Sequence, residues 1–119
     1  MSLAVGQDWS GKFACSHGET LVILHVERVD GARVQGALLF REQATGAAGS
    51  YDVGGTFDFA TGVITLEAGD WIDRPEGHTK ERVTGVLHDR MITGSFGTPS
   101  CLLSLSLTDG LPTFAEPEE

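Results

Sequence analysis

The sequence is poor in basic residues and in long apolar runs, and each shortage excludes a class of function. Eight lysines and arginines stand against 17 aspartates and glutamates, which gives a formal net charge of −9. Such an acidic surface repels phosphate backbones and anionic lipid, so we expect no binding to nucleic acid. No apolar run approaches the roughly 20 residues that a membrane-spanning helix requires, so we expect no membrane span.

Metal-binding, phosphate-binding and catalytic patterns are also missing. The histidines show no metal-ligand spacing with one another or with either cysteine. They are His17, His25, His78 and His88. The glycines fall at strand positions and hairpins, not at the strand-to-helix turn where a phosphate-binding loop lies. We therefore expect no metal, no cofactor and no enzymatic activity.

The chain is rich in glycine and in a two-residue alternation of apolar and polar side chains. Sixteen glycines are about twice the usual share for this length. The alternation recurs in short segments separated by turn signals such as Asp30-Gly31, which is typical of an antiparallel meander. We predict strands over 9–15, 20–28, 33–41, 50–57, 62–68, 80–87, 91–96 and 101–108.

These eight strands predict an all-β fold. Closing the antiparallel up-and-down meander into a small barrel removes the two exposed edges of an open sheet, so we favour the barrel. A two-sheet β-sandwich is the alternative. One domain accounts for the length. We expect an N-terminal tail over 1–8, the barrel over 9–108 and an acidic C-terminal tail over 109–119.

Four predicted strands share the frame apolar-x-Gly-x-apolar, whose three residues fall on one face of a strand. The glycines of these frames are Gly36, Gly55, Gly85 and Gly94. Inward glycines let strands bend sharply around a narrow barrel, which is the interpretation we prefer. The other interpretation is that they leave room for a ligand inside.

Two predicted strands are apolar on both faces, at Leu21–Leu24 and at Cys101–Leu103. Something must cover their outer faces, because large apolar patches rarely stay in water. A second copy in a homodimer would do so. The candidates from the tails are Leu3, Val5, Leu111 and Phe114.

The two cysteines lie in the first and last predicted strands, which barrel closure makes neighbours. Cys15 and Cys101 are therefore candidates for a disulfide, which suits an exported protein, whereas cytosolic thiols stay reduced. Met1–Gln7 has neither a basic start nor a long apolar centre, so it does not resemble a signal peptide. Two compartments stay open: the cytoplasm, or the exterior if a leader has been removed.

The chemically richest stretch is Leu66–His78, which we predict to be the loop between the fifth and sixth strands. Function concentrates in such loops. The preferred interpretation turns Trp71 and Ile72 inward over one barrel end, above a solvated rim that holds an acid–arginine pair. The alternative makes Trp71 a lid or a contact for a partner. The candidate ligand- or partner-binding residues are Asp70, Trp71, Ile72, Asp73, Arg74, Glu76 and His78.

Scattered tryptophan, glycine and cysteine positions form a pattern that resembles small bacterial β-barrel domains. The residues of this pattern are Trp9, Gly11, Cys15, Gly18, Thr20, Gly69, Trp71, Ile72, Pro75, Gly77, His78 and Cys101. These domains carry no assigned activity, so the resemblance implies a bacterial protein and transfers no functional residue. In topology the chain also resembles avidin-like and lipocalin-like barrels, where a tryptophan such as Trp9 closes one end. The tryptophans that wall the avidin ligand site have no counterparts here.

Three functions follow, in order of preference. The first is a non-catalytic binding or assembly module that contacts a protein partner or forms a homo-oligomer, favoured by the apolar outer faces and the missing catalytic pattern. The second is a carrier for a small apolar ligand, with its pocket under the Trp71 loop. The third is a hydrolase-type enzyme that uses the loop carboxylates with His78.

Overall fold

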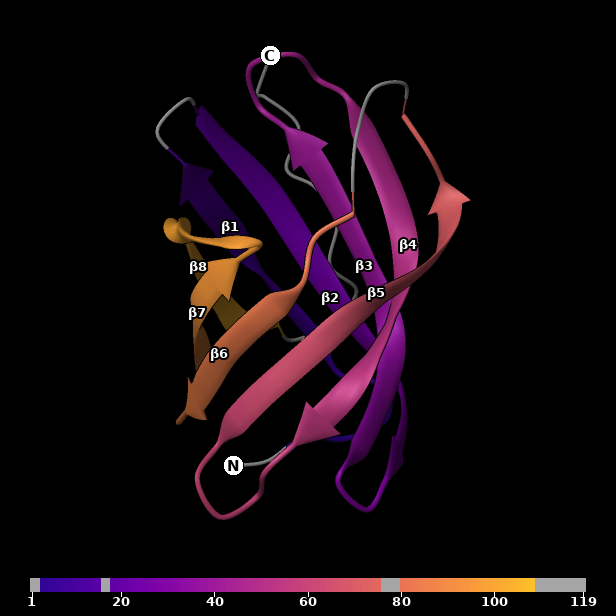
Figure 1. Cartoon of the computed structure of the whole chain (residues 1–119), viewed down its shortest axis with the longest axis vertical. Coiled ribbons are helices and arrows are strands. Elements are labelled where there is room, and N and C mark those ends of the chain that lie inside the picture. Colours follow the sequence, from indigo (N-terminus) through magenta and orange to yellow (C-terminus); the bar gives the residue numbers. More distant parts are fainter. Residues whose placement is uncertain (1–2, 16–17, 76–79, 109–119) are drawn as a thin grey trace.

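Eight β-strands make up the fold of the computed structural model, which describes residues 3–15, 18–75 and 80–108 (Figure 1). Each strand pairs antiparallel with the next, and β8 pairs with β1, so the sheet closes into a barrel. The predicted up-and-down barrel is therefore confirmed. In the part of the chain that the structure describes, no helix is long and apolar enough to cross a membrane. The strands are Asp8–Cys15 (β1), Gly18–Asp30 (β2), Arg33–Glu42 (β3), Ala48–Phe57 (β4), Val63–Asp73 (β5), Val83–His88 (β6), Met91–Phe96 (β7) and Thr98–Thr108 (β8).

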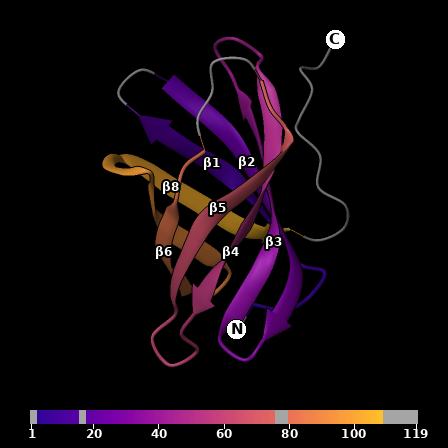
Figure 2. The same cartoon turned by 45° about the vertical axis from the view of Figure 1, so that its right-hand side comes forward.

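Inward side chains from all eight strands form one apolar core. Trp9 of β1 has no exposed surface, and its indole N–H donates to Oε1 of Gln7 at 3.3 Å. Leu3, ahead of β1, joins the same core. The Gly6 N–H donates to the Val26 carbonyl oxygen, and the Val26 N–H donates to the Gln7 carbonyl oxygen, which fixes the segment ahead of β1. The segment 3–7 therefore packs at the barrel end that carries the β2–β3 and β4–β5 turns (Figures 1 and 2).

The frame glycines allow neighbouring strands to approach closely. At Gly55 and Gly94 an added Cβ would overlap the carbonyl oxygens of Thr65 and Thr84 on adjacent strands. Gly36 is placed in the same way. Backbone atoms thus occupy the space beside these glycines. This arrangement supports the interpretation of strand curvature and close approach, and not the one of room for a ligand.

The fifth strand continues through most of the stretch predicted as a loop. β5 ends only at Asp73, so residues 69–73 extend the strand predicted over 62–68, and the interpretation of them as a loop is wrong. Strand β4 begins at Ala48, and its early residues supply the backbone partners for the extension, as in the pairing of Ser50 with Asp73. The extra length of β5 follows from the length of its neighbour.

A β-bulge in this extension decides where its large side chains point. Along β4 the pairing steps by two residues, from Val53 to Tyr51, while along β5 it steps by three, from Ala68 to Trp71. The extra residue reverses the alternation of faces. Trp71 consequently packs against the core, whereas Ile72 is 57% exposed. The expectation that both turn inward is therefore wrong for Ile72.

The two outer faces predicted to need cover, at Leu21–Leu24 and at Cys101–Leu103, differ in their exposure to solvent. Ile23 of β2 points away from the core and is nevertheless only 6% exposed. Leu102 of β8 is 66% exposed. Among the candidate covering residues, Val5 is itself 63% exposed, and Leu111 and Phe114 lie outside the described residues. In a single copy of the chain, the outer face of β8 thus presents an apolar side chain to solvent.

Candidate functional site

Three aromatic rings pack together at the barrel end where β5 finishes. The ring centroid of Trp71 lies 6.3 Å from that of Phe40 and 5.4 Å from that of Tyr51, the second pair being edge-on. Tilted aromatic pairs of this kind contribute about 0.5–1.5 kcal/mol beyond their burial. The contacts of Trp71 support the interpretation in which it covers one barrel end.

The outer side of Trp71 is occupied by cations of the same chain. The guanidinium carbon of Arg74 lies 5.8 Å from the ring centroid, and Nζ of Lys80 lies 5.9 Å from it. Each such contact contributes about 0.5–1 kcal/mol at an exposed site. Lys80 also donates to the carbonyl oxygen of Gly69. The Trp71 ring is thereby held between the core and the cationic groups of Arg74 and Lys80. This packing does not favour the interpretation of Trp71 as a mobile lid.

Within the described residues, Asp70 and Asp73 do not form the expected pair with Arg74. Asp70 and Asp73 are exposed, and neither carboxylate has a hydrogen bond or ion pair within the described ranges. Arg74 stacks on the tryptophan instead. Glu76 and His78 lie outside the described residues. The rim thus offers no support for a general acid–base pair between Asp70 and Asp73.

Side chains of β4 and β5 tie down the segment ahead of β6. The Tyr51 hydroxyl donates to the Glu81 carbonyl oxygen at 3.0 Å and accepts the Glu81 N–H at 3.2 Å. Nε of Arg82 lies 2.8 Å from Oε2 of Glu67. The pKa of Tyr51 is raised to about 12, mainly by burial; the hydrogen bond from the Glu81 backbone lowers the pKa, and the nearby charge of Glu81 raises it. Tyr51 therefore stays a neutral hydrogen-bond donor at physiological pH.

Cys101 is disulfide-bonded in the structure. The only other cysteine of the chain is Cys15, whose side chain lies outside the described part. The β1–β8 ladder reaches the pair Ala14 and Leu102, so one further step along each strand arrives at the two cysteines. Their pairing stays a prediction, and the ladder places their backbones in suitable register for it.

A second surface, which the sequence reading did not single out, runs across the outside of four consecutive strands. We call it the β5–β8 face. We define it by ten outward residues that are apolar or hydroxyl-bearing; the outward Glu67 and His88 lie at its ends. The ten residues are Val63, Thr65, Thr84, Val86, Met91, Thr93, Ser95, Leu102, Ser104 and Ser106.

Backbone register joins these residues into continuous rows. Val63 pairs with Val86, which pairs with Thr93, which in turn pairs with Ser104. Val63 is 42% exposed and Val86 43%; among the described residues, Met91 and Leu102 are two further large apolar side chains exposed to solvent on this face. The face therefore combines four solvent-exposed apolar groups with small hydroxyl groups.

Ionisable residues lie at the ends of the β5–β8 face, and one of them, His88, pairs in register with Met91. The Glu67–Arg82 pair lies at one end, and His88 lies at the other, with Nδ1 3.3 Å from Asp89. The sequence carries a signal for this face: the outward positions of several strands hold Thr, Ser or Val and not charged residues. Comparison with protein-family models, with curated proteins and with solved structures gave no match.

Proposed function

We propose that the protein is a non-catalytic binding module that assembles through its β5–β8 face, and that the partner is a second copy of the chain. The observation that carries the proposal is a block of ten outward positions without an ionisable side chain, four of them apolar and exposed. Charge is depleted and apolar area enriched at the centres of protein–protein contacts.

Electrostatics favours this face over the rest of the outer surface. Two copies with a net charge of −9 repel each other wherever charged surfaces meet. The β5–β8 face brings no like charges together, so it is the surface on which two identical acidic chains meet at least cost.

The size of the face limits the strength of the contact. Four strands spaced about 4.8 Å apart, with outward residues repeating about every 6.8 Å, cover on the order of 400 Å² per copy. A standard stable interface buries about 800 Å² per partner. We therefore expect a weak, reversible dimer with a Kd on the order of 10⁻⁴ M.

Sedimentation equilibrium over a concentration series tests the proposal. The natural chain should shift from monomer towards dimer near the expected Kd. Val86→Glu places a charge at the centre of the face and should weaken association at least about tenfold, because the interface would bury an unpaired carboxylate. Val5→Glu is the matched control, since it makes the same change at a 63% exposed valine elsewhere.

A strict monomer at every concentration would contradict the proposal, as would equal weakening by Val5→Glu. A dimer that Val86→Glu leaves intact would place the contact on another surface.

A further inference from the structure

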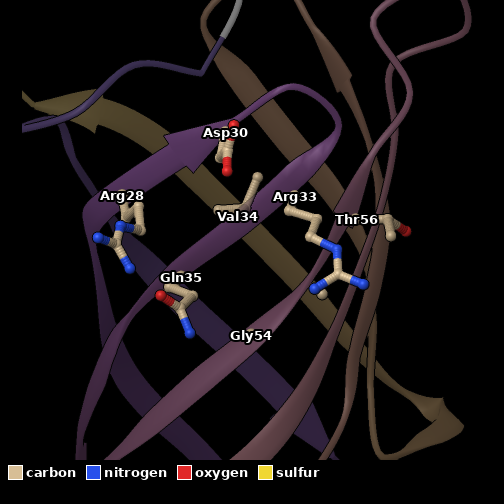
Figure 3. Close-up of a pocket in the computed structure, with 8 residues that line it drawn as sticks. Arg28, Asp30, Arg33, Val34, Gln35, Gly54 and Thr56 are labelled. Carbon is tan, nitrogen blue, oxygen red and sulfur yellow. The ribbon is translucent and has the colours of Figure 1, made fainter.

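A second feature is a groove on the outside of β2, β3 and β4, whose residue Thr56 adjoins Thr65 at the edge of the β5–β8 face (Figure 3). Its volume is about 460 Å³, within the range of small-molecule sites. Polar side chains line most of it, in contrast with the barrel interior. The residues that carry the argument are Arg28, Asp30, Arg33, Gln35, Gly54 and Thr56.

Strand register sets the layout of the groove. Arg28 pairs with Gln35, which pairs with Gly54, and this forms one row across the three strands. The neighbouring row runs from Arg33 to Thr56. In Figure 3 the two guanidinium groups flank the amide of Gln35, one on each side.

A β-bulge brings Arg28 into this layout. The pairing of β2 with β3 shifts between Val26, which is fully buried, and Arg28. Without the shift, strict alternation from Val26 would direct Arg28 to the core side. Bulges commonly re-aim a side chain at functional positions. The bulge here turns a basic residue outward, opposite Gln35.

The two arginines of the groove are unpaired in a chain that has an excess of acids. Neither guanidinium group has a hydrogen bond or an ion pair in the described part of the chain, although Asp30 pairs in register with Arg33. Elsewhere Lys12 pairs with Glu19 and Arg82 with Glu67. The cationic groups of the groove are therefore available to a ligand.

Gly54 leaves the floor of the groove open, and the fold does not require a glycine there. A Cβ added to Gly54 would lie 3.7 Å from the carbonyl oxygen of Val34 and 3.8 Å from Cγ of Gln35, which are ordinary contacts. The next residue, Gly55, has no such room. The missing side chain at Gly54 thus provides space on the outer surface without serving strand packing.

We propose that this groove binds a small organic anion that carries two or more carboxylate or phosphate groups. Two guanidinium groups on opposite sides of the groove suit two anionic groups, because each presents a fork of N–H donors that matches a carboxylate or phosphate. The Gln35 amide and Thr56 hydroxyl supply further hydrogen bonds, and the Asp30 carboxylate accepts one from a ligand hydroxyl or amine.

Titration with citrate and with pyrophosphate, followed by amide chemical shifts at constant low ionic strength, tests the proposal. Shifts should centre on 28–35 and 54–56, and acetate should bind at least about tenfold more weakly than the multivalent anion. Binding of citrate alone would assign the carboxylate class, and binding of pyrophosphate alone the phosphate class. Both results support the site.

Variants distinguish a specific binding site from non-specific electrostatic attraction of anions. Arg28→Gln and Arg33→Gln should each weaken binding about tenfold, since a charge-assisted hydrogen bond is lost. Gly54→Val should weaken it comparably by filling the floor, without loss of fold. Lys12→Gln removes the same charge from a neighbouring outer face and should leave binding unchanged. Failure of both anions to bind, or an equal loss in Lys12→Gln, would overturn the proposal.

Discussion

Raising the pH through the alkaline range perturbs one buried group whose contribution to stability can be worked out. Tyr51 is 1% exposed, and its pKa rises from 10.0 to about 12. Below pH 10 the hydroxyl is protonated in both the folded and the unfolded chain, so its contribution is fully present. Between pH 10 and about 12 only the unfolded chain releases the proton. Stability therefore falls by up to about 1.4 kcal/mol per pH unit, roughly 3 kcal/mol in total.

The chain contains a single tyrosine, so tyrosinate absorbance reports on this residue alone. The folded protein should titrate with a midpoint near pH 12, and denaturant unfolding should show the loss of stability between pH 10 and 12. Tyr51→Phe is the control, because the phenylalanine variant lacks this component of the pH dependence. A midpoint near 10 in the folded protein would refute the assignment of Tyr51 as a desolvated donor to Glu81.

Three further predictions follow from packing. Gly54→Ala should stabilise the barrel by about 0.5–1 kcal/mol. Gly55→Ala should destabilise it by about 3 kcal/mol or more, because the added Cβ would overlap a carbonyl oxygen. Equal effects of the two variants in urea unfolding would contradict the strand register. Cys101→Ser should cost about 4 kcal/mol if the bond closes the loop of about 85 residues to Cys15, and peptide mapping without reductant should recover the two cysteines linked within one chain. Ile72→Ser should change thermal stability by less than about 0.5 kcal/mol, because the side chain is exposed; a large loss would place it in the core.

The fold was readable from the sequence because its signal is local. Alternation and turn residues mark each strand, and closure follows from the need to remove two sheet edges. The Val34-Gly36-Leu38 frame shows the strength of this signal: Val34 and Leu38 are buried, and Gly36 lies against the neighbouring strand.

The candidate sites were harder to predict because two bulges break the alternation. One lies near Tyr51 and Trp71 and turns Ile72 outward; the other precedes Arg28 and directs it into a groove. An inserted residue reverses the faces of everything after it, and the sequence marks neither bulge clearly. The β5–β8 face could be identified only from the strand register, which aligns outward side chains of four consecutive strands in common rows.

The most direct test of the central claim is a dilution series followed by amide chemical shifts. The account predicts that concentration-dependent shifts concentrate on the outward residues of β5 to β8, around Val86, Thr93 and Leu102, and disappear in Val86→Glu. Amide chemical shifts that do not change on dilution, or changes that centre on the outer face of β2 to β4, would contradict assembly through the β5–β8 face.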